Sequence, residues 1–466
     1  MTPPERVARG LAARGRVPLG AHGRWRPGSD RPDPVAALER QGANRDPELV
    51  PLRHGRMVSS AFAFYRGGAA IMAADLATTP VTGLRAQLCG DAHLANFGIF
   101  DTPERAHVFD INDFDETLPG PWEWDVKRLA ASVEVAGRDL AFNAGERRAA
   151  VLACTRAYRE RIAELAEMGN LEVWHARLGA DDVLAHLADE RDPKLAKKVQ
   201  RDVRKGLQRN HLTAFSKLVD RSDGEVRFAS RPPLLVPIDE LLTDRGRRRY
   251  VGVIREFLDQ YRASLPASHR ALVDGYRYVH LARKVVGVGS VGTRSLVVLM
   301  VGRDEADPLL LQLKEAKRSV LEPYCGVSVY RRKGQRVVEG QRLMQAASDP
   351  LLGWYRLRAL DDKVHDFYVR QLWDGKASID LTHLAPAGLA RYAEACGLTL
   401  ARAHARTGFR ISIAAYLGDS DEFDQAVADF AAVYADVNEE DHARLSQAIE
   451  AGRLPVAFDA EPPPAP

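Results

Sequence analysis

The sequence predicts an α+β fold in which a strand-rich segment lies between helical segments. Apolar residues recur at helical spacing over much of residues 51–280 and again after residue 379. Between residues 281 and 378 they fall instead in short runs that glycine turns separate, which is typical of strands. The chain has 466 residues, more than one ordinary core accommodates, so more than one packed unit is expected.

This pattern divides the chain into five parts. Residues 1–50 are rich in Pro, Gly and Arg and are expected to form a partly disordered arm. Residues 51–280 are expected to form a helical lobe and residues 281–378 a β-rich lobe. Residues 379–456 add helices that complete the helical lobe, and residues 457–466 form a disordered tail.

The elements follow in order from the spacing of apolar residues and from turn residues. Before residue 280 we expect helices at 57–76, 125–140 and 146–165, strands at 84–88, 97–100 and 107–111, and mostly helix over 170–280. After residue 280 we expect strand, glycine turn and strand over 285–302, strands at 309–316 and 367–373, and helices at 337–347, 384–405, 423–434 and 440–450.

Charge and composition limit the classes of partner. The 66 basic and 63 acidic residues leave a net charge of +3, which argues against binding nucleic acid mainly through its phosphates. The longest strongly apolar run, 295–301, is too short to span a membrane, and the N-terminus lacks an apolar signal region. The four cysteines lie far apart, so we expect reduced thiols and a cytoplasmic protein without nucleic-acid or membrane partners.

Two neighbouring segments, 90–98 and 109–116, carry a high density of carboxylates and amides. Several of these residues directly follow apolar strands, where sites are commonly built, and their hard oxygen atoms suit Mg²⁺. Zinc is less suitable because only His93 and His107 offer nitrogen ligands. The alternative is a loop rich in Asx turns and caps, without a metal.

The spacing within these segments favours phosphoryl transfer. In kinase-type sites the catalytic Asp is followed five residues later by a metal-binding Asn, and a second Asp holds metal further along the chain. Asp91 and Asn96 have this separation, and a predicted strand hairpin leads to Asp110 and Asp113. The sequence therefore predicts Asp91 as the catalytic base, with metal held by Asn96 and Asp113, or by Asp110 as second choice.

The same segments resemble a known group. GDAHLANFG at 90–98 resembles the catalytic loop of aminoglycoside phosphotransferases and choline kinases, and INDFDE with GPWEWDVKRLA resembles their metal-binding aspartate and the following helix. Over most of residues 45–450 the chain is similar to a bacterial family, domain of unknown function 2252, that is grouped with protein-kinase-like folds. The resemblance implies that His93 shapes the catalytic loop. Two departures are Cys89, where those enzymes have His, and a longer gap from Asn96 to Asp113.

A nucleotide-binding lobe is predicted from the segment GVGSVG at 287–292. Its glycines precede a strand rather than a helix, which favours a lid over ATP phosphates against a dinucleotide-binding turn or an ordinary hairpin. The residues predicted to bind nucleotide here are Gly287, Gly289, Ser290 and Gly292.

Lys314 ends the next strand and is predicted to contact the ATP phosphates. Its expected carboxylate partner is Glu339, with Glu322 or the neutral Gln341 as alternatives. Backbone groups near Gln371, Leu372 and Trp373 are expected to meet the adenine.

The glycine segment and Lys314 follow the catalytic loop by about 200 residues, whereas in ordinary kinases they precede it. The resemblance therefore implies a two-lobed, protein-kinase-like fold that is circularly permuted. The expected activity is ATP- and Mg²⁺-dependent transfer of the γ-phosphate to a hydroxyl or amine of a small molecule or protein. Alternatives are nucleotidyl transfer to protein with ATP reversed, or a non-catalytic nucleotide-binding pseudokinase. We expect helices of 140–280 and 400–450 to line the acceptor pocket.

Overall fold

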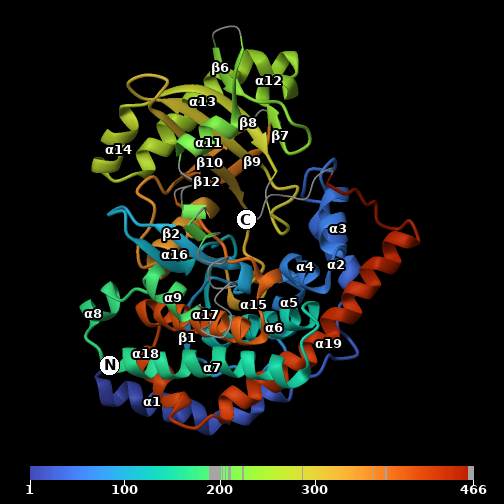
Figure 1. The fold of residues 1–466 in the computed structure, drawn as a ribbon, viewed down its shortest axis with the longest axis vertical. Helices are drawn as coiled ribbons and strands as arrows, with labels where there is room; N and C mark the ends of the chain where they lie inside the picture. The colour runs from blue at the N-terminus through green and yellow to red at the C-terminus, as the bar shows by residue number, and fades with distance from the viewer. Residues whose placement is uncertain are drawn as a thin grey trace.

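The computed structural model describes the chain except residues 188–200, 202, 205, 208–210, 223–224, 286, 360–361, 373–374 and 460–466. It forms two lobes (Figure 1). The sheet lobe is built from residues 211–372, and the helical lobe from residues 1–187 and 375–459. The predicted α+β class is confirmed.

The centre of the sheet lobe is a six-stranded antiparallel sheet in the order β11-β12-β10-β9-β8-β7. Strands β8, β9 and β10 form a meander. Helix α16 then leads to the edge strand β11, and β12 lies between β11 and β10. The bounds are β7 Leu235–Pro237, β8 Arg277–Lys284, β9 Ser295–Val301, β10 Pro308–Ala316, α16 Lys333–Met344, β11 Gly353–Arg358 and β12 Val364–Gln371.

Both faces of this sheet are covered, which explains the nearly continuous apolar runs of β9 and β10. Helix α13 packs Phe257 and Tyr261 against Val298, Leu311 and Val369 on one face. Residues of α11 and β6 cover the other face, where a separate apolar cluster forms. The elements are α11 His211–Leu218, β5 Val219–Ser222, β6 Glu225–Phe228, α12 Ile238–Leu241, α13 Asp244–Ser264 and α14 Ala267–Asp274.

The helical lobe is organised around α6, α7, α17 and α19, which enclose the largest apolar core. Trp122 of α6 stacks on Tyr158 of α7 at its centre, with ring centroids 5.6 Å apart. Two short hairpin-like pairs, β1 with β4 and β2 with β3, lie on this core and carry the two acidic segments. Their bounds are β1 Arg85–Leu88, η2 Leu94–Asn96, β2 Phe97–Asp101, β3 His107–Ile111 and β4 Leu118–Pro121.

The remaining helices have these bounds: α1 Pro3–Arg16, η1 Leu19–Gly23, α2 Pro34–Gly42, α3 Val50–Val58, α4 Ala61–Gly67, α5 Ala69–Leu76, α6 Trp122–Asp139, α7 Ala144–Glu167, α8 Asn170–His175, α9 Ala180–Leu187, α15 Glu322–Cys325, η3 Leu381–His383, α17 Pro386–Thr407, α18 Arg410–Leu417 and α19 Glu422–Glu450. Among the described residues, no helix is both long and apolar enough to cross a membrane.

Several boundaries differ from those predicted. The expected helix 57–76 is interrupted, because Ser60 caps α4 through a hydrogen bond from Ala63 N and Gly68 separates α4 from α5. The two helices expected after residue 423 are one continuous helix, α19. The sheet lobe begins near residue 211 rather than 281, because α13 and α14 pack on the sheet rather than on the helical core.

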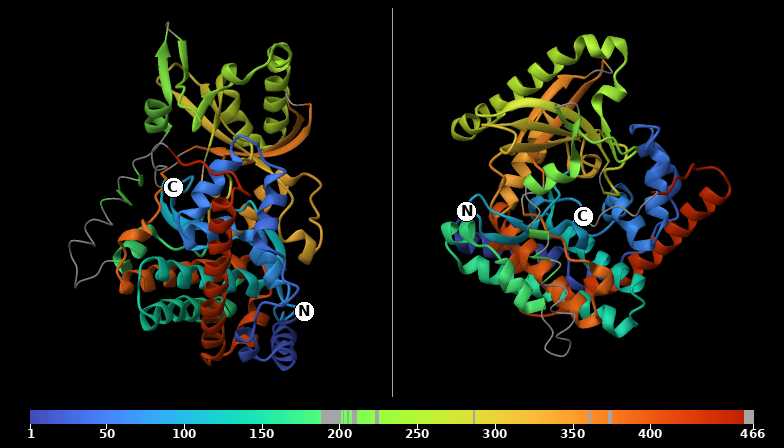
Figure 2. Two further views of the ribbon diagram at one scale, coloured as in Figure 1. Left: turned by 90° about the vertical axis from the view of Figure 1, so that its right-hand side faces the viewer. Right: turned by 45° about the horizontal axis from the view of Figure 1, so that its top comes forward.

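The N-terminal arm is folded, where a partly disordered segment was expected. Helix α1 packs along α18, and η1 lies against α19 (Figure 2). Trp25 contacts Phe430 and Tyr434. Apolar contacts of this kind offset the cost of ordering the chain, which composition alone does not reveal.

Arg31 ties this arm to the helical core. Its guanidinium donates to Asp75 of α5 and to Asp441 of α19 at 2.6–2.9 Å, and all three side chains are largely buried. Removing the cation leaves two buried carboxylates without their partner, which is far more costly than losing an exposed pair.

We therefore expect Arg31→Met to lower the free energy of unfolding by about 3 kcal/mol in urea denaturation. The exposed Arg24 serves as a matched control, and Arg24→Met should leave stability within about 0.5 kcal/mol of wild type. Equal losses in the two variants would show that the buried bridge contributes nothing specific.

Candidate functional site

A cavity of about 160 Å³ lies where the two lobes meet. Its wall combines the loop after β1, the acidic segment after β3, the glycine segment between β8 and β9, the residues following β10, and α2 and α4. The predicted site residues on this wall are Asp91, His93, Asn96, Asp113, Gly287, Gly289 and Ser290. The structure thus brings to one cavity segments that lie about 200 residues apart in the chain.

Helix α6 fixes the backbone of the candidate catalytic loop, residues 90–98, through hydrogen bonds. The carboxylate of Asp125 accepts hydrogen bonds from Cys89 N at 2.8 Å and Gly90 N at 3.1 Å. Gly90 has a φ of +81°, and a Cβ there would lie 2.5 Å from Glu116 O, so only glycine fits this turn. The loop therefore approaches the acidic segment more closely than another residue would allow.

Asp91 is fixed by an arginine on the same helix. Both Nε and Nη2 of Arg128 donate to its Oδ1, at 2.8 and 2.6 Å, and Arg128 also donates to Tyr65 O. No described residue donates to Oδ2. Burial raises the pKa of Asp91 although Arg128 opposes the shift. The side chain is thus held in place with one oxygen available on the cavity side.

His93 and Asn96 complete the loop in different ways. Burial and the nearby arginines hold the pKa of His93 well below its usual value, so the ring is neutral, and its Nε2 lies 3.8 Å from Asp91 Oδ2. The side-chain amide of Asn96 donates to Asp91 O at 2.8 Å, while Asn96 O accepts from Asn112 N at 2.8 Å. Asn96 therefore links the catalytic loop to the acidic segment.

The structure distinguishes the two aspartates proposed to bind metal. Asp110 is fully buried and engaged with Arg402 and with Ala346 N, so it has a structural role away from the cavity. Asp113 lines the cavity, with its Oδ2 3.4 Å from Lys314 Nζ. Burial opposes ionisation of Asp113, but Lys314 and Arg370 outweigh it and hold its pKa below the usual range.

Lys314 reaches across from the sheet lobe, but its predicted partners were wrong. Its Nζ donates to Asp115 Oδ2 at 2.8 Å and to Asp113 Oδ2, and these carboxylates raise its pKa in spite of burial. Tyr368 also donates to Asp115, at 2.6 Å.

The three residues expected to pair with Lys314 are engaged elsewhere. Glu339 pairs with Arg342, Glu322 lies 4.0 Å from Arg318, and Gln341 donates to Gln345. The side chain that α16 sends toward Lys314 is Arg336, which donates to the backbone oxygens of Asp115, Thr117 and Lys317.

The glycine segment covers the cavity as a turn that leads straight into β9, with no helix after it. Gly287 and Gly292 have φ values of +65° and +82°, which other residues rarely adopt. Gly292 O accepts from Asp46 N.

Residues from both ends of the chain hold this segment. Arg56 of α3 donates to Gly287 O and pairs at 2.8 Å with both oxygens of Asp459, which follows α19. The segment is therefore anchored by the N-terminal helices and, through Arg56, by the chain after α19.

The segment expected to contact adenine has different surroundings from those predicted. Leu372 N donates to Leu310 O, and Gln371 N donates to Asp349 Oδ2, so these two amides are already used. Trp373 lies outside the described residues. Two basic side chains flank the segment: Arg370 donates to Gln312 and to Asn112 O, and burial beside Arg370 lowers the pKa of Lys376 to about 7.

Four cations near the catalytic loop were missed or undervalued in the sequence. Arg45, Arg66 and Lys317 line the cavity, and Arg128 lies behind it. Of these four side chains, Arg66 is the one most typical of a ligand-binding group, because its buried Nε has no hydrogen-bond partner among the described residues. The FYRGG segment offered one signal, since glycines directly follow this arginine. The helical pattern of 125–140 gave no sign that Asp125 and Arg128 face the loop.

The residues present fit a magnesium ion better than zinc. In the part of the chain that the structure describes, no group of three or more His, Cys, Asp or Glu side chains is arranged to hold a metal. Asn96 and Asp113 nevertheless offer hard oxygen atoms on one cavity wall, and Mg²⁺ commonly takes its other ligands from phosphate and water.

Comparison with known proteins places the chain in one family. The family described as "Uncharacterized protein conserved in bacteria (DUF2252)" matches residues 45–448, so the chain belongs to it. No curated protein and no solved structure matches the chain.

Glu116 makes the stability of this region depend on pH. Burial, reinforced by Asp115 and Asp91, raises its pKa from the usual 4.5 to about 7. The folded state then holds the proton more tightly than the unfolded state, so this residue makes folding less favourable as pH rises from 4.5 to about 7. Glu116→Gln retains an acceptor for Val320 N, and its stability relative to wild type should increase across this window in urea denaturation at several pH values. If the stabilities of wild type and Glu116→Gln changed equally with pH, the raised pKa of Glu116 would be contradicted.

Proposed function

We propose that this protein is an ATP- and Mg²⁺-dependent phosphotransferase with a permuted, protein-kinase-like arrangement of its two lobes. The observation that carries the proposal is the single cavity on which Asp91, Asn96, Asp113 and the glycine segment converge, with Lys314 paired to the same acidic segment. Each of these residue types has a role in kinase-type phosphoryl transfer, and their positions were predicted from motifs, spacing and the resemblance to phosphotransferases.

The order of the sheet lobe supports this proposal. In kinases the glycine-rich loop joins two strands, and the phosphate-binding lysine lies on the next strand, before a helix. Here the glycine segment joins β8 and β9, Lys314 lies on β10, and α16 follows. The cavity is smaller than the sites that hold drug-sized ligands, so in this proposal it widens when ATP binds.

In the proposed reaction, an acceptor hydroxyl or amine forms a bond to the γ-phosphorus of ATP. The bond from that phosphorus to the β,γ-bridging oxygen breaks, and ADP leaves with the electron pair. Asp91 Oδ2 orients the acceptor and takes its proton, while Arg128 keeps the carboxylate in position. A magnesium ion held by Asn96 and Asp113 would neutralise phosphate charge. In this proposal Arg66, on the cavity wall, binds phosphate oxygens, and Lys314 does so when it exchanges its contact with Asp113 or Asp115 for the nucleotide.

A second candidate, nucleotidyl transfer, is favoured by Arg370 and Lys376. These basic side chains flank the segment expected to meet the neutral adenine, and Arg370 is close enough to Asp113 to affect its pKa. A phosphate beside Lys376 would favour its protonated form. Buried cations stabilise phosphate far better than they stabilise a neutral base. With ATP reversed, the β- and γ-phosphates would lie beside them, and the α-phosphorus would be the group transferred.

Replacing Asp91 separates catalysis from nucleotide binding. Asp91→Asn should lower transfer by about a thousandfold, because the amide cannot take the acceptor proton. The rise in melting temperature with Mg²⁺ and ATP should remain, since ligand binding to the folded state does not need this base. Asp304→Asn, in the exposed turn after β9, serves as the matched control. Near-normal transfer by Asp91→Asn would show that the catalytic loop is assigned wrongly.

ATP that is radiolabelled at one known phosphate shows which group is transferred. The purified protein is incubated with heat-treated bacterial extract and Mg²⁺, together with ATP labelled at either the α- or the γ-phosphate. Label from γ-phosphate alone, absent with Asp91→Asn, is expected for the phosphotransferase. Label from the α-phosphate alone would establish the reversed orientation. Binding of ATP without transfer from either position would identify a pseudokinase.

A further inference from the structure

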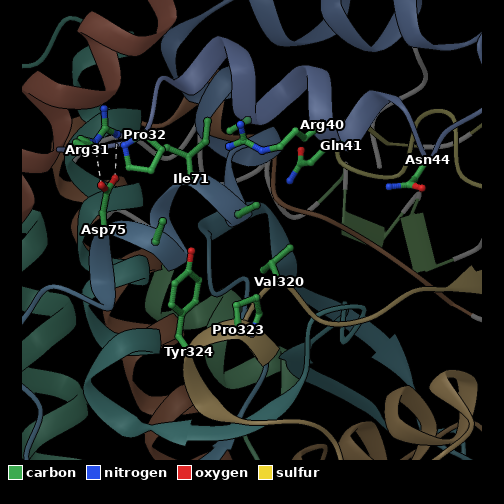
Figure 3. Close-up of a pocket in the computed structure, with 13 residues that line it drawn as sticks. Arg31, Pro32, Arg40, Gln41, Asn44, Ile71, Asp75, Val320, Pro323 and Tyr324 are labelled. Carbon is green, nitrogen blue, oxygen red and sulfur yellow. Dashed lines mark hydrogen bonds and ion pairs between the residues drawn. The ribbon is translucent and has the colours of Figure 1, made fainter.

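A larger pocket, of about 330 Å³, lies beside the catalytic cavity. Figure 3 shows α2 on one side of it, with Arg40 and Gln41, and Val320, Pro323 and Tyr324 on the other. Helix α5 closes the space between them through Ala70, Ile71 and Ala74. Because Ala70 and Ala74 are one helical turn apart, two small side chains on the same helix face leave this space open.

This pocket adjoins the candidate catalytic cavity. Gln41 and Val320 line both spaces, and neighbouring residues of α5 face them, Ala69 in the cavity and Ala70 in the pocket. A ligand seated in the pocket can therefore extend a functional group between Gln41 and Val320 toward the wall that carries Asp91. The pocket is formed by residues 31–44, helix α5 and residues 320–324, and not by residues 140–280 and 400–450, from which we expected the acceptor site.

The chemistry of the lining selects among ligands. Seven of the thirteen lining residues are apolar: Pro32, Ala37, Ala70, Ile71, Ala74, Val320 and Pro323. At one end Arg31 is neutralised by Asp75 and Asp441. Arg40 makes no ion pair or hydrogen bond with a described residue, and Figure 3 shows its guanidinium extending over the pocket. The amide nitrogen of Gln41 likewise has no described acceptor, because only its oxygen is used, by Arg53.

From these features we infer that the pocket binds the acceptor of the phosphotransferase, and that the acceptor is a small molecule with an apolar body and an anionic group. The inference rests on the proposed function. The apolar body packs on α5 and Tyr324, the anionic group accepts hydrogen bonds from Arg40 and Gln41, and a hydroxyl or amine reaches Asp91. The volume, at the low end for ligand sites, accommodates a small molecule.

The pocket is tested with 4-(hydroxymethyl)benzoate, which has a ring, a carboxylate and a primary hydroxyl, and with its neutral analogue 1,4-benzenedimethanol. Binding is followed by ligand-observed NMR titration. The wild-type protein should bind the benzoate about tenfold more tightly than the neutral analogue, as one charge-assisted hydrogen bond implies. Arg40→Gln should remove this preference, whereas Arg24→Gln, an equal charge change at an exposed arginine outside the pocket, should retain it.

Ala74→Phe fills the pocket and should abolish binding of both probes while leaving the ATP-induced rise in melting temperature unchanged. It should also lower γ-label transfer to the small-molecule fraction of the extract about tenfold or more. Probe binding that is equal in wild type, Arg40→Gln and Ala74→Phe would overturn the pocket. Transfer that is undiminished in Ala74→Phe, or label found in protein instead, would overturn its role as the acceptor site. Absence of an ATP-induced shift in the wild type would count against the proposed function, independently of probe binding.

Discussion

The packing of the two lobes against each other depends above all on the ion pairs between the buried ammonium of Lys314 and two carboxylates. A cation removed from water is stable only beside compensating charge, and the helical lobe supplies this with Asp113 and Asp115. β10 is therefore drawn against the acidic segment, and the strands bonded to β10 bring the glycine segment over the same place. The cluster of Lys314, Asp113 and Asp115 thus helps to bring the walls of the cavity together.

A second constraint comes from α6, which positions the opposite wall. Asp125 binds the backbone at the start of the candidate catalytic loop, and Arg128, one turn later, binds the side chain of Asp91. A single rigid helix thus sets both the path of the loop and the direction of its carboxylate. His404 of α17 approaches Asp125 at 3.3 Å and accepts or donates a hydrogen bond with Tyr158, so the support extends into the helical core.

The sequence predicted the local features well and the contacts between distant segments poorly. The α+β class follows from periodicity, and Asp91, Asn96 and Asp113 stand out because their chemistry and spacing are visible within a few residues. The partners of Lys314 were not predictable, because Asp113 and Asp115 lie about 200 residues earlier in the chain and meet it only when the two lobes pack together. Glu339, the partner expected from α16, pairs with Arg342 instead. Likewise Arg45 and Arg66 resemble surface charges until α2 and α4 are seen to line the cavity. The N-terminal arm is folded rather than disordered because it makes aromatic contacts with α19, about 400 residues away in the chain.

The anchoring of the glycine segment has a consequence for biosynthesis. Arg56, near the start of the chain, holds Gly287 O and is itself paired with Asp459, beyond α19. Ribosomes release a chain from its N-terminus onward, so the sheet lobe is complete long before Asp459 emerges. Until then Arg56 lacks its carboxylate, and the cover of the cavity has only part of its support. The glycine segment therefore gains this part of its support only after α19 and Asp459 have been synthesised.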